Sequence, residues 1–347
     1  MRIVLASLAA SGLVTALVVA TAPPATAAPE VTTLSTAYVD PTQLAVRGDR
    51  VLVTDGRRLT EVGRSRALAQ VASGGDVAGV ALGPGTAYAY GSSNRGRTDT
   101  RLTIVGSRTV VARLSAHERR YNPDRRVVYG VQGASKCVRD AFKALDGGAA
   151  AYTGRVGSHP AAVANSGANW YVADSVGNDV LRVYASGQVR TIAVLPRQPF
   201  TFTRRVVTGL GMPSCVVGAR YQGEPAPTDV EVGPDGMLWV TTLPQLYDLG
   251  QPGSLYRIDP RTGSVRRFAT GFQGATNVAV TASGKIFVAE RLSGRVAAVR
   301  SSGRWSTYLT LPGVLGLEAV GETLYASVAA PESMGVRTGP GTIVRIG

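Results

Sequence analysis

Six polar side chains occur at one recurring position, the start of a short apolar strand, and their types could do chemistry. They are Gln43, Asp76, His159, Asp229, Asn277 and Glu318. Carboxylates, an amide and an imidazole that converge on one axis can bind a hard cation, and they can also move protons. His159, which precedes Pro160, is the candidate catalytic base. For Ca²⁺, the one cofactor candidate, the candidate ligands are Asp76, Asp229, Asn277 and Glu318.

Each of these residues also has a purely structural interpretation. Asp, Asn and Thr are common at strand starts because their side chains satisfy backbone groups of the preceding turn. A lone histidine is most often a hydrogen-bonded loop residue. The other histidine, His117, begins the run His-Glu-Arg-Arg, which is typical of a solvated charged segment. The sequence contains no G-x-S-x-G nucleophile motif and no phosphate-binding loop.

The elements that must position these side chains form an internal repeat. The clearest copy has strands at 228–232, 237–240, 255–258 and 264–268, with Gly, Pro and Asp in the turns. Five further copies have first strands at 43–46, 79–82, 161–164, 276–280 and 317–320. Repetition of a four-stranded antiparallel meander predicts an all-β fold, a six-bladed β-propeller over residues 28–347.

The last copy is one strand short, because the chain ends after the strand at 342–346. Residues 31–34 form a β-type segment near the other end, and this segment has no blade of its own. We expect this N-terminal strand to pair with the last blade and close the ring, since closure removes both open sheet edges.

Two long insertions, 115–157 and 196–227, each join the last strand of one blade to the first strand of the next. A shorter insertion, 243–253, joins a second to a third strand, so all three are expected as loops on one face of the disc. Cys137 lies in the first insertion and Cys215 in the second. In a secreted chain two cysteines indicate a disulfide first, and a free thiol nucleophile lacks a convincing histidine partner.

The first 27 residues have the order of a secretory signal peptide. Arg2 precedes an uncharged apolar run over 3–20, two prolines end the run, and Ala25-Thr26-Ala27 supplies an A-x-A cleavage site. An uncleaved membrane anchor is the alternative, but the run is at the short limit for a span. We therefore expect a secreted, extracellular protein that is cleaved near Ala27.

The composition is strongly basic, with a net charge of +14 and a pI near 10.3. Nearly all of the cations are arginines, which are scattered along the chain instead of forming a dense run. Scattered charge does not favour specific nucleic-acid binding. It does allow a general attraction to an anionic cell wall or membrane surface. We expect a monomer whose partner is an extracellular ligand or protein.

Several segments resemble the ScyD/ScyE family of secreted propellers, over nearly the whole mature chain. The best segments are NPD at 122–124, YGV at 129–131, SHP at 158–160, VADSVGN at 172–178, PSC at 213–215 and PTDVEVGPDG at 227–236. The two cysteines also match the family's actinobacterial pattern. The sequence departs from that pattern near 116–125, where His117-Glu118 replaces Tyr-Glu and Asp124-Arg125 replaces Asp-Gly. More distantly, the blades resemble NHL-repeat proteins, gluconolactonase-like propellers and streptogramin lyases.

The resemblance implies a fold more than a function, because it supplies no catalytic motif, and such propellers include both metal-dependent enzymes and binding modules. We favour a non-catalytic extracellular module whose insertion-bearing, disulfide-tied face binds a ligand or protein. The alternative is a metal-dependent hydrolase, lactonase or lyase. In that interpretation Asp229, Asn277 and Glu318 hold a cation at the channel mouth, and His159 moves protons.

Overall fold

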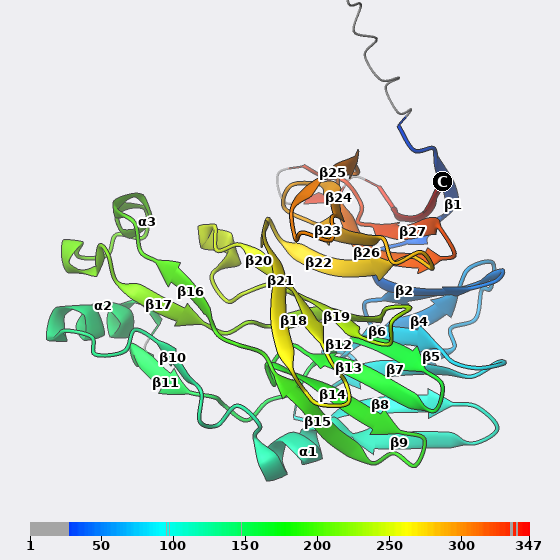
Figure 1. Ribbon diagram of the computed structural model, residues 1–347, viewed down its shortest axis with the longest axis horizontal. Coiled ribbons are helices and arrows are strands. Elements are labelled where there is room, and N and C mark those ends of the chain that lie inside the picture. Colours follow the sequence, from blue (N-terminus) through cyan, green and yellow to red (C-terminus); the bar gives the residue numbers. More distant parts are fainter. Residues whose placement is uncertain (1–27, 95, 97, 147, 334–335, 338) are drawn as a thin grey trace, which may run out of the picture.

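The computed structural model describes residues 28–94, 96, 98–146, 148–333, 336–337 and 339–347. The expected signal peptide lies outside these described residues. Strands dominate the described chain, which forms seven four-stranded antiparallel sheets and one short hairpin. The protein is therefore all-β, and the arrangement of the sheets is that of a β-propeller (Figure 1).

Six of these sheets follow the repeat found in the sequence. Listed from the first strand to the last, they are: β2 (Pro41–Arg47), β3 (Arg50–Asp55), β4 (Arg58–Glu61) and β5 (Ala69–Gln70); β6 (Asp76–Leu82), β7 (Tyr88–Ser93), β8 (Thr100–Val105) and β9 (Thr109–Arg113); β12 (Pro160–Ser166), β13 (Asn169–Asp174), β14 (Asp179–Tyr184) and β15 (Val189–Val194); β18 (Pro227–Val232), β19 (Leu238–Thr242), β20 (Gly253–Ile258) and β21 (Val265–Phe272); β22 (Ala275–Val280), β23 (Ile286–Glu290), β24 (Arg295–Val299) and β25 (Trp305–Thr310); and β26 (Val314–Val320), β27 (Thr323–Val328), β30 (Gly341–Ile346) and β1 (Val31–Tyr38).

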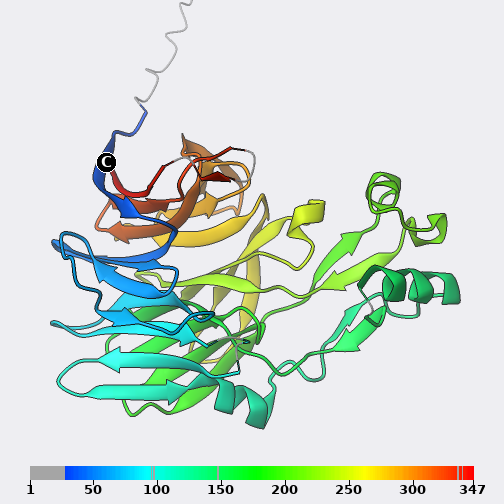
Figure 2. The same ribbon diagram turned by 180° about the vertical axis from the view of Figure 1, so that it is seen from behind.

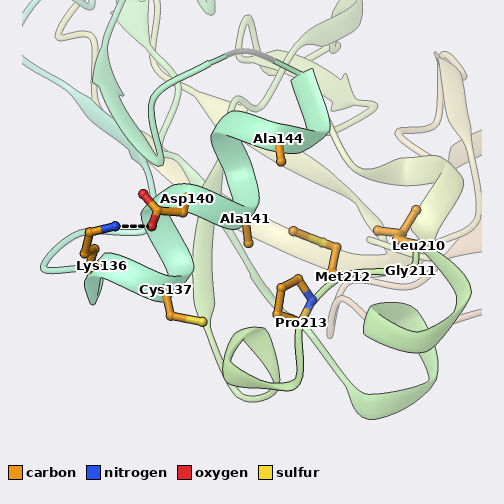
Figure 3. A pocket seen from close by; sticks show the side chains of 9 residues that line it. All are labelled: Lys136, Cys137, Asp140, Ala141, Ala144, Leu210, Gly211, Met212 and Pro213. Atoms are coloured by element: carbon orange, nitrogen blue, oxygen red, sulfur yellow. Dashed lines mark hydrogen bonds and ion pairs between the residues drawn. The ribbon is translucent and has the colours of Figure 1, made fainter.

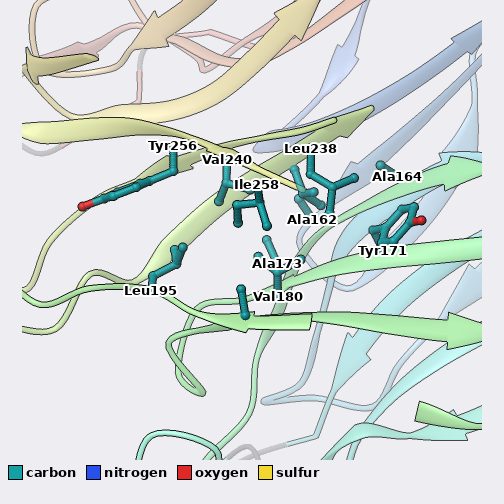
Figure 4. Close-up of a cluster of buried hydrophobic side chains, with 12 residues drawn as sticks. Ala162, Ala164, Tyr171, Ala173, Val180, Leu195, Leu238, Val240, Tyr256 and Ile258 are labelled. Atoms are coloured by element: carbon teal, nitrogen blue, oxygen red, sulfur yellow. The ribbon is translucent and has the colours of Figure 1, made fainter. Parts of the chain in front are cut away.

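The first strands of successive sheets pack side by side in the order β2, β6, β12, β18, β22 and β26, and β26 also packs against β2. Successive residues of a strand point to opposite faces of the sheet, and in second strands such as β19 and β23 every residue is buried, so each sheet presents one buried face to each of its two neighbours. Figure 4 shows such an interface, in which Ala162 and Tyr171 of one sheet meet Val240, Tyr256 and Ile258 of the next. The hydrophobic core is thus a series of layers between sheets.

Close approach of the inner strands requires a glycine at position 79. A Cβ atom there would lie 2.7 Å from Cα of Ala162, on β12 of the neighbouring sheet. No side chain larger than hydrogen fits that distance without moving a backbone.

The N-terminal strand β1 pairs antiparallel with β30, from Val31 opposite Ile346 to Tyr38 opposite Gly341. Glu30 and Gly347 extend this pairing, because each backbone N–H donates to the other residue's carbonyl, at 2.9 and 3.1 Å. The first and last described segments of the chain are therefore held together by sheet hydrogen bonds.

The two long insertions pair with each other and form the seventh sheet, which the sequence analysis wrongly treated as loops. Its order is β11 (Ala151–Thr153), β10 (Val128–Gly130), β17 (Arg220–Gly223) and β16 (Gln198–Thr201). Each insertion supplies one hairpin of this sheet. The local sequence of one hairpin therefore does not indicate that it pairs with the other. We call this sheet and its helices the insertion lobe; Figures 1 and 2 show that it projects from the disc of blades.

Short helices complete the insertions. These are α1 (Leu114–Tyr121), α2 (Lys136–Asp146), α3 (Arg204–Gly209) and the 3₁₀ turn η2 (Ser214–Val216). The lobe has its own core, in which the Phe142 ring meets Phe202 edge-on at 5.4 Å and stacks on Tyr221 at 5.8 Å.

The predicted disulfide between Cys137 and Cys215 is confirmed and joins α2 to η2, with the two Cα atoms 6.4 Å apart. No described cysteine is free. Closing a loop with a sequence separation of 78 stabilises the protein by about 4 kcal/mol in the loop-entropy model. Among the described helices, none has both the length and the apolar composition needed to cross a membrane.

Candidate functional site

The candidate metal ligands of the inner strands act as acceptors that link neighbouring sheets. Asp229 Oδ2 accepts from the backbone N–H of Val278 at 2.8 Å. Asn277 Oδ1, at the matching position of the next sheet, accepts from Leu317 N–H at 2.7 Å. These bonds favour the structural interpretation of both residues, because the oxygens needed for a cation already have donors.

The remaining members of the polar set extend the same network. The Glu318 carboxylate accepts from the Val46 backbone on β2, so it joins the last sheet to the first. The amide of Asn277 donates to Gln43 Oε1 at 2.7 Å. Asp76 contacts His159 instead of these residues. Within the described ranges, no group of three or more His, Cys, Asp or Glu side chains is arranged to hold a metal ion.

Three carboxyl groups nevertheless lie close together on the inner strands β18 and β26. Burial raises the pKa of Asp229 and of Glu231 well above their usual values, and the charge of Glu318 raises both further. Burial likewise raises the pKa of Glu318 to about 7. Glu231 was not predicted from the sequence. It lies two residues after Asp229 on the same strand, so the two side chains are on the same face of the sheet. These groups can share protons at neutral pH.

His159 and Asp76, two separately predicted candidates, form a pair. His159 Nε2 lies 2.6 Å from Asp76 Oδ2, and Nδ1 lies 3.0 Å from Ser175 Oγ. The pair joins β6 to the start of β12, and the histidine side chain is only 14 % exposed. Both ring nitrogens are engaged, so His159 is placed as a clamp between two sheets and has no nitrogen directed at a substrate.

Asp174, at the end of β13, fixes the loop that carries His159. Its carboxylate accepts from His159 N–H at 2.6 Å, Gly177 N–H at 3.0 Å and the Ser158 hydroxyl at 2.5 Å. Asp55 and Glu290 end the second strands of two other sheets and bind the preceding loop in the same way. The repeat therefore encodes this carboxylate as a structural element.

Around Asp174 the structure gathers a buried acidic cluster that the sequence analysis did not predict. We use this name for Glu118, Asp124, Asp174 and Asp179, which are 3 %, 0 %, 1 % and 0 % exposed. Asp124 Oδ2 accepts from the Tyr129 hydroxyl at 3.0 Å and from the Asn178 amide at 3.1 Å. Among the described residues, Glu118 Oε1, Asp124 Oδ1 and both oxygens of Asp179 have no donor that meets the distance and angle limits of a good hydrogen bond.

Protonation is the physical response of such a cluster to burial. Burial, followed by the charges of Asp174 and Asp124, raises the pKa of Glu118 to about 8. The same causes raise the pKa of Asp179 well above its usual value. A hydrogen bond from the nearby Thr191 hydroxyl lowers the pKa of Asp179 by less than these causes raise it. Perturbed pKa values of this kind gather at functional sites more often than elsewhere.

The expectation that the segment around Glu118 is solvated is wrong for Glu118 itself. The helix α1 places Glu118 one turn after Leu114, on the face that packs against the blades. Four-residue spacing from a buried leucine was the available signal. The histidine of this segment, His117, is also half-buried.

A cavity of about 400 Å³ opens beside the acidic cluster. Glu118, Ser115, Ser158, Gly157 and Val176 are among its lining residues. A second cavity, of about 330 Å³, is lined by Asp76 and Ser93, and Gly96 borders both. The acidic cluster and these cavities lie where α1, from the first insertion, meets the blades. They form the candidate functional site.

A larger cavity of about 580 Å³ lies on the insertion lobe between α2 and the segment 210–213 (Figure 3). Ala141, Met212 and Pro213 line it, and its rim carries the ion pair of Lys136 with Asp140, at 2.6 Å. None of the buried unpartnered polar groups of the described residues belongs to its lining.

The sequence matches no protein-family profile and no curated protein. Its fold is similar to that of an aldose sugar dehydrogenase from Streptomyces coelicolor, solved in its PQQ-bound form, at 13% identity and a TM-score of 0.55, covering 94% of this chain and 99% of that one. It is also similar to a gluconolactonase from Xanthomonas campestris, at 14% identity and a TM-score of 0.53, covering 92% of this chain and 89% of that one. A streptogramin B lyase is similar at 11% identity and a TM-score of 0.50, covering 92% of this chain and 97% of that one. At such identities these neighbours establish a propeller-type fold alone.

Proposed function

We propose that the chain is a secreted six-bladed β-propeller of the ScyD/ScyE type that binds an extracellular ligand on its insertion-bearing face. The pairing of β1 with β30 supports closure of the ring, as does the acceptance of the Val46 N–H by Glu318. Removal of residues 28–36 should therefore lower the melting temperature. An unchanged melting temperature would contradict closure by this strand. Amino-terminal sequencing of the secreted protein tests cleavage near Ala27.

The observation that carries the binding proposal is Glu118 Oε1, a buried oxygen that has no partner among the described residues and belongs to a side chain lining the 400 Å³ cavity. A buried acceptor without a donor costs free energy, and this cost disappears when a ligand brings donors. A ligand with an ammonium group or several hydroxyl groups supplies them. Glu118 is the member of the acidic cluster that lines the cavity, so it is the expected first contact.

Binding of a cation to protonated Glu118 should release a proton, because the ligand charge stabilises the carboxylate. Titration calorimetry with glucosamine in two buffers of different ionisation enthalpy measures that proton directly. N-acetylglucosamine, which has the same ring without the amine charge, is the matched ligand control. Glu118→Gln should abolish the proton release, and exposed Glu322→Gln should retain it. Failure of both glucosamine and N-acetylglucosamine to bind would refute this site.

A metal-dependent hydrolase, lactonase or lyase is the second candidate, and the carboxyl group of Glu231 beside Asp229 and Glu318 favours it. Here Ca²⁺ would displace the shared protons, while His159 and Asn277 would keep their positions in the inter-sheet contacts. Metal analysis and melting with and without Ca²⁺ test this candidate. A Ca²⁺-dependent shift that Asp229→Ala abolishes would favour the enzyme over the binding module. A flat response would remove the proposed metal site.

A further inference from the structure

A groove of about 490 Å³ runs between α1 and the β14–β15 edge, and none of its lining residues belongs to the acidic cluster. Its lining includes His117, Tyr121, Arg125, Tyr184 and Arg190. The other lining residues are Pro123, Gln188, Val189 and Thr191, so no carboxylate is among them. The groove thus combines two arginines with two tyrosines and carries no opposing charge of its own.

The acids of this segment do not neutralise its arginines at the surface. In the run 117–126, Glu118 and Asp124 point inward and are 3 % and 0 % exposed. The four arginines of the same run, at 119, 120, 125 and 126, are all exposed. The run has four arginines and two acids in the printed sequence, and because both acids are buried it presents four exposed positive charges, of which Arg125 lines the groove and Arg119 lines the Glu118 cavity. This gathering differs from the scattered pattern that the sequence predicts.

The two groove arginines are not neutralised by described carboxylates, although Arg190 hydrogen-bonds the Tyr184 hydroxyl of the same groove. Neither Arg125 nor Arg190 forms an ion pair with any carboxylate in the described part of the chain. Arg125 Nη1 is fixed by the carbonyl of Tyr121 at 2.6 Å and by that of Asn122 at 3.3 Å. This leaves the rest of a positioned guanidinium, whose planar donors suit carboxylate and phosphate groups.

Tyr121 offers an aromatic face in the same groove. It is 48% exposed, although its ring is held by His117 at 4.8 Å and by the Arg120 guanidinium at 5.3 Å. A held, exposed ring binds at low entropic cost. Sugar rings and nucleic-acid bases both stack on such a face.

We propose that this groove binds an anionic polysaccharide, with Arg125 and Arg190 contacting its carboxylates or phosphates and Tyr121 contacting a sugar ring. The choice of a glycan over a single-stranded nucleic acid rests on the proposed secretion. The anion itself is common to acidic wall sugars and to phosphorylated ones. The groove and the Glu118 cavity use different residues, so either proposal can fail alone.

The test uses the mature chain, residues 28–347, with polygalacturonate and yeast phosphomannan as probes and uncharged dextran as the blank. Arg125→Gln/Arg190→Gln should weaken binding of at least one anionic probe by tenfold or more, about what loss of two charge-assisted contacts predicts. The matched control Arg300→Gln/Arg304→Gln removes the same charge from an exposed turn of the β24–β25 hairpin and should stay within about twofold of wild type. Melting temperatures verify folding of each variant.

Tyr121→Ala separates the sugar contact from the charge contacts. It should weaken binding of both anionic glycans by several-fold without changing the dependence of the binding constant on salt concentration. Tighter binding of polygalacturonate would identify the anion as a carboxylate, and tighter binding of phosphomannan would identify it as a phosphate. Equal losses in the two double-arginine variants would overturn the proposal in favour of non-specific charge. Absence of binding to both glycans, or tighter binding of oligo(dT) than of either glycan, would also overturn it.

Discussion

Replacing Glu118 by glutamine should make the stability of the protein less dependent on pH. The folded protein holds a proton on Glu118 up to about pH 8, whereas the unfolded chain releases it near 4.5. The folded state therefore binds more protons between these values, and the free energy of unfolding falls as pH rises through this window. The difference between the two pKa values corresponds to about 5 kcal/mol. Because Glu118 lines a cavity of about 400 Å³, which is large enough to hold water, we expect roughly half of that.

Urea unfolding at pH 5, 7 and 9, followed by tryptophan fluorescence, measures this effect. The wild type should lose about 2–3 kcal/mol more than Glu118→Gln between pH 5 and 9, because glutamine keeps the shape and cannot ionise. Other buried carboxyls contribute their own slopes, so the difference between variant and wild type is the quantity to compare. Glu322→Gln is the control, since Glu322 is exposed, lies 3.1 Å from Lys285, and has a lowered pKa. An identical slope in Glu118→Gln and wild type would refute the burial of an ionisable Glu118.

Three further predictions concern the fold. Cys137→Ala/Cys215→Ala should reduce the stability of the insertion lobe by about 4 kcal/mol, seen as faster amide hydrogen exchange over 128–153, and unchanged exchange would show that the sheet does not need the link. Asp229→Ala should cost about 2 kcal/mol in urea unfolding because it leaves the Val278 N–H unpaired, while Asp229→Asn keeps an acceptor and should cost less than half as much; equal costs would argue against this inter-sheet bond. Gly79→Ala should cost about 1–3 kcal/mol by forcing β6 away from β12, whereas Gly209→Ala, where a Cβ meets no atom within 4 Å, should be nearly neutral; similar values would contradict the close approach.

The strands of the repeat could be predicted because each carries its own signal, a short apolar run that is alternating or β-branched and is bounded by Gly, Pro or Asp. The pairing of β1 was also accessible, since the last repeat lacks one strand. The sheet of the insertion lobe was not, because its two hairpins lie on either side of β12–β15 and depend on contacts between them. Sequence reasoning predicts local order well and predicts poorly which distant segments meet.

The candidate site shows the same division. The position that recurs is the third residue of the inner strand, which holds Gln43, Asp229 and Asn277 and makes contacts between sheets. The expectation of one shared position was wrong for the others, because Asp76 is the first residue of β6, His159 precedes β12 and Glu318 is the fifth residue of β26. Glu118 was missed because its charged neighbours indicated a solvent-exposed segment, whereas the helix places its side chain on the buried face. Its signal lay in the four-residue spacing from Leu114.

The link between Cys137 and Cys215 encloses the whole of β12–β15 within one covalent loop. If the two chain ends are pulled apart, tension passes through the sulfur atoms and bypasses that sheet. The oxidised chain should therefore stretch to a contour about 260 Å shorter than the reduced chain, at roughly 3.4 Å for each of the 78 residue steps spanned. This blade therefore bears no load while the disulfide is intact, and it unfolds under tension only after reduction.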